Sequence, residues 1–226
     1  SSAASDVYKR QTAAFFKENQ VIVILCMYLI GMFIGVIMAF ILKYFVFKGE
    51  AVPFVMELPN YRMPDAGNVY RLIYTKAKDF ITRAFTIIFW ATIVIWFLQT
   101  FDMRLNLVTN SADSLLAMLG SLLTPIFQPL GLNDWRISTA FITGFMAKES
   151  VVSTLSVLAG NISEMFTPIT AFVFMVFCLL YTPCVAAIAT VRRELGRRYA
   201  VMVVLMQCSI AWLAAFAIYR LASIVF

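Results

Sequence analysis

Residues 137–158 read ISTAFITGFMAKESVVSTLSVL, an apolar segment that carries the charged pair Lys148-Glu149 in its middle. Ionisable groups at membrane depth are costly, and they usually face a protein interior or a water-filled path. Gly144 permits a helix break four residues earlier, and backbone groups freed at such breaks coordinate ions in transporters. We therefore expect Glu149 to hold a cation, Lys148 to neutralise it or snorkel, and Gly144 and Ser150 to border the site. The alternative is a structural ion pair, or a helix end near the surface.

The composition indicates a membrane protein. Hydrophobic residues make up 62% of the 226-residue chain, charged residues only 13%, and the mean hydropathy is +0.86. A soluble domain of this length cannot bury so much apolar surface. Segments 21–42, 165–191 and 199–219 each run for about 20 residues without a charge, enough to cross a hydrocarbon layer of roughly 30 Å. Segment 84–101 is slightly shorter, and we expect it to span as well.

The positions of the basic residues set the expected topology. The net charge of +6 arises largely from clusters in 43–83 and 192–198, at the edges of the predicted spans. This bias is typical of cytoplasmic loops and gives no reason to expect a nucleic-acid partner. If both loops are inside, segments 114–130 and 137–158 either both cross the membrane or both re-enter it as hairpins.

Breaks in these two segments favour broken helices over long clean spans and leave crossing and re-entry both open. Pro125, Pro129, Gly131 and Gly144 interrupt them, and irregular backbone at membrane depth is tolerated where protein shields it or where it lines a cavity. The predicted fold class is therefore all-α, a polytopic transmembrane helix bundle with broken or re-entrant helices.

Several chemistries are missing from the sequence. It has no His, so a histidine metal site and a Ser-His-Asp or Cys-His arrangement are excluded. It also lacks a GxxxxGK[ST] phosphate loop, and its four cysteines lie in apolar segments without a CxxC pair. We expect neither an enzyme nor a disulfide framework in this region.

A second candidate site is Tyr181-Thr182-Pro183-Cys184, within the apolar segment 165–191. Pro183 removes a backbone donor and disrupts the helix, which leaves carbonyls one turn earlier without their usual partners. A cation path can use those carbonyls. The Cys184 thiol suits late first-row divalent metals far better than sodium or magnesium, although a small packing residue is the alternative role.

Two further patterns are weaker. Residues 52–64 contain three prolines, and after them Asp65 or Asn68 can cap an amphipathic helix that lies along the inner membrane surface. We expect Glu57 to form a salt bridge rather than to bind a cation. Gly31 and Gly35 form a GxxxG pair on the first span, which permits close helix contact.

Taken together, the motifs resemble a known family. The string PFVMELPNYRMP, followed by a basic amphipathic run and a span ending VIWFLQTFD, is similar to the C-terminal region of the ferrous-iron transporter family FeoB. DWRISTAFITGFMAKESVVSTLSVL and LLYTPCVAAIATVRRELG are similar to that family's second Gate region, in the same order and spacing. The resemblance covers residues from about Lys43 to the end.

The resemblance implies a C-terminal membrane fragment of a GTP-dependent Fe(II) importer of a bacterial or archaeal inner membrane. Gate regions are similar to those of nucleoside transporters. The family's proposed metal-path cysteine corresponds to Cys184 and its polar Gate motif to Lys148-Glu149-Ser150. Fe(II) is then the transported substrate, held by Cys184 and Glu149, whereas GTP and Mg bind a domain absent from this sequence.

The implied organisation and partners follow. We expect residues 1–11 to form a non-native or disordered tail, 12–47 a transmembrane helix, 48–102 the FeoB C-terminal region and 111–226 the second Gate region. The partners are the lipid bilayer, the protein's own N-terminal GTP-binding domain and first Gate region, small cytoplasmic Feo proteins and other copies of the chain.

Two other functions stay open at this point. The region can be a structural bundle that moves no metal and docks the GTP-binding domain through its cytoplasmic loop. It can also be a Gate-type transporter of organic solutes such as nucleosides.

Overall fold

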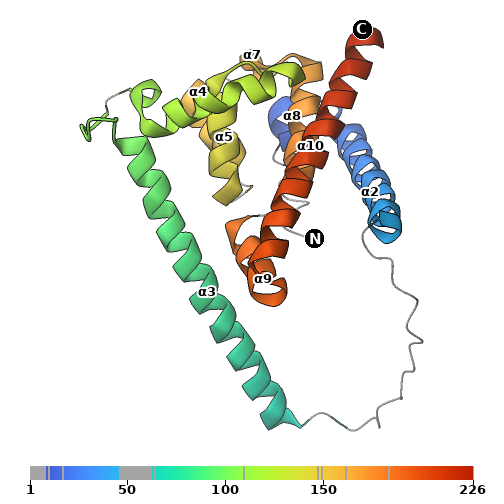
Figure 1. Ribbon diagram of the computed structural model, residues 1–226, viewed down its shortest axis with the longest axis vertical. Coiled ribbons are helices and arrows are strands. Elements are labelled where there is room, and N and C mark those ends of the chain that lie inside the picture. Colours follow the sequence, from blue (N-terminus) through green and yellow to red (C-terminus); the bar gives the residue numbers. More distant parts are fainter. Residues whose placement is uncertain are drawn as a thin grey trace.

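The computed structural model of the chain describes residues 9, 11–16, 18–45, 63, 65–108, 110–146, 148, 150–160, 162–182 and 184–225. These residues form an all-α bundle, as predicted (Figure 1). In chain order its elements are α2 (Gln20–Phe45), α3 (Ala66–Thr100), the 3-10 turn η1 (Ser111–Asp113), α4 (Leu115–Phe127), the 3-10 turn η2 (Gln128–Leu130), α5 (Trp135–Met146), α6 (Ser150–Ala159), α7 (Ile162–Met165), α8 (Pro168–Leu180), α9 (Val185–Leu195) and α10 (Arg197–Val225).

Among the residues that the structure describes, three stretches are long and apolar enough to cross a membrane: Gln20–Tyr44, Pro168–Leu195 and Arg197–Ile224. They contain most of the three longest predicted spans. The middle one is not a single helix, because α8 ends at Leu180 and α9 begins at Val185. This is the interruption that Pro183 predicted, although Pro183 itself lies outside the described residues.

Helix α3 is longer than the sequence suggested. The predicted amphipathic segment and the predicted span 84–101 form one helix of 35 residues, which is about 52 Å long at 1.5 Å per residue. Asp65 caps its start as expected, since its carboxylate accepts a hydrogen bond of 3.2 Å from the Asn68 backbone amide. Its described apolar part, Phe89–Thr100, is a shorter stretch, so a crossing by α3 stays a prediction.

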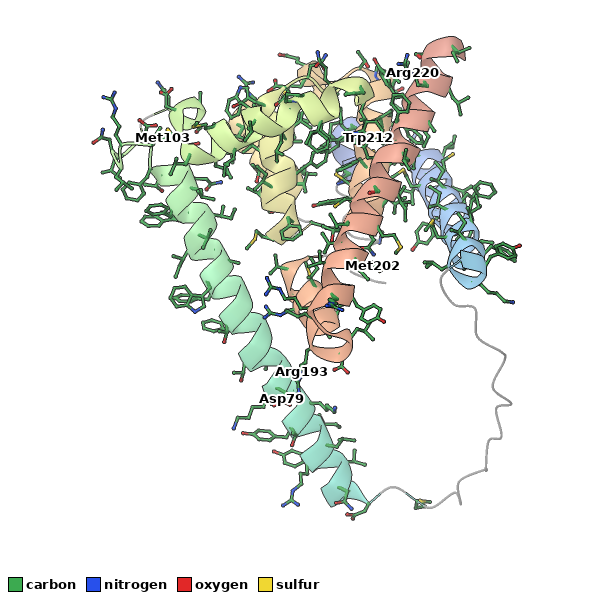
Figure 2. All side chains as sticks on the ribbon, viewed as in Figure 1. Asp79, Met103, Arg193, Met202, Trp212 and Arg220 are labelled. Carbon is green, nitrogen blue, oxygen red and sulfur yellow. The ribbon has the colours of Figure 1, made fainter. Side chains whose placement is uncertain are left out.

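Described residues of both basic regions lie toward one end of the molecule. Figure 2 shows Asp79 and Arg193 toward the end where α3 begins and α9 meets α10, whereas Met103 and Arg220 lie at the opposite end. The chain therefore returns to the same side at both basic regions, which is the arrangement predicted for two loops in one compartment.

The middle of the chain forms a hairpin that enters and returns on one side. The pair α4–η2 meets α5 at 105°, after a turn in which Gly131 has a φ of +76°. Helix α5 runs inward from the level of α4, and α7 lies back at that level (Figure 1). Helix α5 has 12 residues and is about 18 Å long, which is shorter than a hydrocarbon layer of about 30 Å.

The positions of the breaks correct part of the sequence interpretation. Pro125 and Gly144 lie inside α4 and α5 and do not interrupt them. Instead, η2 ends at Leu130 and α5 begins at Trp135, and α5 ends at Met146 before α6 begins at Ser150. Pro125 removes the amide that would donate to the Ser121 carbonyl, yet α4 continues to Phe127.

Helix α8 is the centre of the core. Its buried side chains contact those of α4 and α5 in an aromatic cluster, with ring centroids 4.6 Å apart for Phe141 and Phe177 and 5.3 Å apart for Phe127 and Phe177. The preceding residues take part as well, since Phe15 lies 5.7 Å from Phe174 and Gln11 is fully buried. Residues 1–8 and 10 of the predicted tail lie outside the described residues.

Helix α10 holds the α4–α5 corner from outside. The Trp212 indole donates a hydrogen bond of 2.8 Å to the Ile126 carbonyl near the end of α4 (Figure 2). A Cβ added to Gly131 would lie 2.6 Å from the Tyr219 ring, so the turn and α10 pack without room for a side chain.

We predict that Gly131→Ala lowers the free energy of unfolding by about 1–3 kcal/mol, because the left-handed φ and the Tyr219 ring both oppose a methyl group. The measurement is thermal unfolding in detergent. Gly160→Ala is the matched control, since Gly160 also has a positive φ of +67° but nothing within 4 Å of its added Cβ. If both variants lose the same stability, the contact between Gly131 and Tyr219 does not hold this corner.

Candidate functional site

The two predicted sites meet at Lys148, at the tip of the α5–α6 hairpin. The Lys148 Nζ donates hydrogen bonds to the carbonyl oxygens of Tyr181 (3.0 Å), Cys178 (3.4 Å) and Leu179 (3.5 Å). It also lies 4.9 Å from the centre of the Tyr181 ring. The structure therefore joins two sequence motifs that are about 30 residues apart.

The end of α8 explains why a cation is held here. The last carbonyls of a helix have no partner within the helix, and they carry the negative end of the helix dipole. Helix α8 ends at Leu180, so the carbonyls that Lys148 contacts are among these groups. The ammonium satisfies them in a region where a bare carbonyl would be costly.

Gly144 allows this contact through its small size. A Cβ added to it would overlap Val151 Cγ2 on α6 and the Tyr181 hydroxyl after α8. We predicted that Gly144 breaks the helix, and the structure differs: Gly144 is buried within α5, and its missing side chain lets three chain segments pack together.

Hydroxyl groups connect the two arms of the hairpin. Ser150 Oγ donates a hydrogen bond of 3.1 Å to the Thr143 carbonyl near the end of α5. The hydroxyls of Thr143 and Thr154 share a hydrogen bond of 3.0 Å. Sequence reasoning missed Thr143 and Thr154. The signal was present, since Thr139 and Thr143 are four residues apart and thus share one face of α5.

The hydroxyls lead from the hairpin to a polar cavity of about 290 Å³ between α3, α4, α5 and α6. Its polar lining residues are Gln99, Ser111, Ser114, Thr139, Ser153 and Thr154. Because Thr154 both lines the cavity and contacts Thr143, polar side chains extend from the cavity into the hairpin. Polar groups inside a membrane bundle commonly mark a solute path.

The predicted metal ligands are only partly placed. Cys184 is half-buried at the start of α9, and its carbonyl accepts hydrogen bonds from Ala187 (2.9 Å) and Ile188 (3.1 Å). Thr182 is 2% exposed, and its hydroxyl has no hydrogen-bond partner among the described atoms. Glu149 and Pro183 lie outside the described residues.

The donor atoms are not gathered into a cage. Within the described ranges, no group of three or more His, Cys, Asp or Glu side chains is close enough to hold a metal ion.

The two weaker sequence patterns, the proline-rich segment 52–64 and the GxxxG pair of Gly31 and Gly35, have different outcomes. Residues 52–62, which include Glu57, lie outside the described residues. Of the GxxxG pair, Gly31 faces Leu179 of α8, since its added Cβ would lie 3.7 Å from that side chain, whereas Gly35 has nothing within 4 Å. Only one of the two glycines makes the predicted helix contact.

Two family models match this chain. The Gate model, described as "Nucleoside recognition", matches residues 81–198 and so covers the hairpin, the broken α8–α9 and the contact between them. The chain belongs to the Gate family. A second model, "Ferrous iron transport protein B C terminus", matches residues 24–76. Together the matches identify a FeoB-type C-terminal membrane region carrying a Gate domain, and α3 spans the boundary between them.

Curated relatives agree with this family. The "Fe(2+) transporter FeoB" of Staphylococcus aureus is 35% identical over 201 residues, which is 85% of this chain and 30% of the relative. That of Methanocaldococcus jannaschii is 32% identical over 240 residues, 100% of this chain and 36% of the relative. A Porphyromonas gingivalis "Fe(2+) transport protein A/Fe(2+) transporter FeoB fusion protein" is 30% identical over 282 residues, 100% of this chain and 33% of the relative.

The chain thus spans about a third of the length of the curated relatives it matches. No solved structure matches it.

We predict that Gly144→Ala destabilises the Gate domain by about 1–3 kcal/mol, because the methyl group has to displace α6 or the end of α8. Thermal unfolding in detergent measures this loss. Gly35→Ala is the matched control, a helical glycine with open space around its added Cβ, and it should leave the stability unchanged or slightly higher. Equal melting temperatures for Gly144→Ala and the unmodified protein would contradict this packing.

Proposed function

We propose that this chain is the C-terminal membrane part of a GTP-dependent Fe(II) importer of the inner membrane and forms part of the metal path. The observation that carries the proposal is the contact between two broken helices, in which a membrane-embedded cation binds the free carbonyls of α8. The names of the relatives, which are Fe(2+) transporters, support iron as the solute.

The path begins at the polar cavity beside α3. A hydrated ion enters among its hydroxyl and amide groups, and the hydroxyls of Thr154, Thr143 and Ser150 lead toward the hairpin tip. Gly144, Tyr181 and Thr182 border the path there. This supports passage of an ion that keeps part of its water shell.

Cys184 and Glu149 are the proposed metal ligands at the inner part of the path. A thiolate and a carboxylate together suit Fe(II) and other late first-row divalent ions and bind sodium or magnesium weakly. Transport requires weak binding at such a site, because the ion has to leave.

The energy source and partners lie outside this chain. GTP and Mg would bind an N-terminal domain, and a first Gate region would complete the path. The name of the Porphyromonas gingivalis relative, a fusion with Fe(2+) transport protein A, supports a small cytoplasmic Feo protein as a partner. Further copies of the chain are also proposed partners.

One observation favours docking as an additional role. The first turns of α3 extend beyond the rest of the bundle (Figure 1), and Tyr70, Arg71, Tyr74, Lys76 and Lys78 on them are exposed. This basic, aromatic surface suits contact with a cytoplasmic domain.

We predict that Cys184→Ser and Glu149→Gln each reduce Fe(II) uptake at least tenfold in cells that express the protein with its native flanking sequence, because each removes a ligand. Cys208→Ser on α10 is the matched control and should keep normal uptake. Uptake of radioactive iron under reducing conditions is the measurement. Since both ligands bind metal only when deprotonated, uptake should also fall in acid.

Normal Fe(II) uptake in both ligand variants would overturn this assignment. Loss of uptake in Cys208→Ser as well would indicate general damage to the bundle. Binding of nucleosides with indifference to divalent metals would instead support transport of organic solutes.

A further inference from the structure

We propose that the carbonyl oxygens of Cys178, Leu179 and Tyr181, with the Tyr181 ring, form a seat for a bare cation, and that Lys148 is its tethered occupant. A permeating ion has to displace this ammonium before it uses the same oxygens. The gating role rests on the proposed transport function, whereas the seat itself can be tested without it.

The seat has the composition of a cation site. Three backbone carbonyls surround the Lys148 Nζ at 3.0 to 3.5 Å, and an aromatic face lies 4.9 Å away. Carbonyl oxygens that replace an ion's water shell are the basis of selectivity filters, and aromatic faces attract cations in addition. The negative end of the α8 dipole points to the same place.

Two of the three carbonyl contacts of the ammonium are long. Only the Tyr181 carbonyl lies within the usual range for an N–H···O bond, whereas the contacts of 3.4 and 3.5 Å to Cys178 and Leu179 are longer than a good hydrogen bond. The lysine stem has four flexible carbons, so the ammonium can move aside when another cation binds the same oxygens. A small free cation of the same charge can meet all three oxygens at once.

A second polar group beside the seat lacks a partner. The Thr182 hydroxyl follows Tyr181 directly, is 2% exposed and makes no hydrogen bond among the described atoms. A buried hydroxyl without a partner is costly, and such groups in native structures commonly mark a place for a water or an ion. This supports a ligand other than Lys148 at the same position.

The tethered charge would act as a barrier. While Lys148 occupies the seat, its positive charge repels other cations at this depth. The arrangement therefore limits leakage of cations past the seat while Lys148 occupies it.

The test replaces Lys148 and offers the seat a free ion. Lys148→Met is prepared in the protein with its native flanking sequence, and its melting temperature is measured in detergent with rubidium chloride or choline chloride at equal ionic strength. Rubidium fits a carbonyl seat and has little affinity for thiolates, whereas choline is too large. Lys76→Met, at an exposed position on α3, is the matched control.

We expect the melting temperature of Lys148→Met to rise by about 2 °C or more in rubidium relative to choline, because an ion that binds only the folded state stabilises it. The unmodified protein and Lys76→Met should show no difference between the two salts. Equal melting temperatures of Lys148→Met in rubidium and choline would overturn the proposal and leave Lys148 as a helix cap.

A second variant keeps the test decisive if Lys148→Met does not accumulate. Lys148→Gln retains an uncharged donor toward the carbonyls, and the same comparison of rubidium with choline applies to it. Because rubidium binding does not involve Cys184 or Glu149, its outcome is independent of whether the protein transports Fe(II).

Discussion

The contact between the Lys148 ammonium and the last carbonyls of α8 is the interaction on which the Gate domain depends. A charge at this depth is tolerated only with partners, and carbonyls at a helix end in a membrane need donors. Each therefore satisfies the other. Without the break after Leu180 the carbonyls would be bonded within a helix, and without the hairpin the charge would not reach them.

The surrounding residues make this contact geometrically possible. Gly144 removes the side chain that would separate α5 from α6 and Tyr181, and Gly131 with Trp212 fixes the corner from which α5 runs inward. The aromatic cluster around α8 fills the rest of the space. Function and fold thus depend on the same few residues, so changes near the path should also affect stability.

The sequence predicted those features that depend on local chemistry. Apolar runs located the long helices, Asp65 was recognised as a cap, and the YTPC motif indicated the interruption between α8 and α9. The FeoB and Gate motifs indicated the family that the comparisons confirm. The choice between crossing and re-entrant segments needed the structure, since length and hydropathy are similar in both cases.

Features that depend on contacts between distant residues were not predictable. Nothing near Lys148 in the sequence indicates that Tyr181 is its partner, because the pairing is set by how α5, α6 and α8 pack. Gly144 was expected to break a helix, since glycine permits both a break and a close approach and local sequence does not distinguish them. The hydroxyl contact of Thr143 and Thr154 appears only when the two hairpin arms are brought together.

The most direct test of a hydrated path at the broken helices is the reactivity of the native cysteines in intact membranes toward a charged methanethiosulfonate reagent, with each site quantified by mass spectrometry. Such reagents react only with thiols that water reaches. The account predicts that Cys184 is modified and is protected by Fe(II), while Cys178, which is 2% exposed, is not modified. An unreactive Cys184, or one that Fe(II) does not protect, would contradict it.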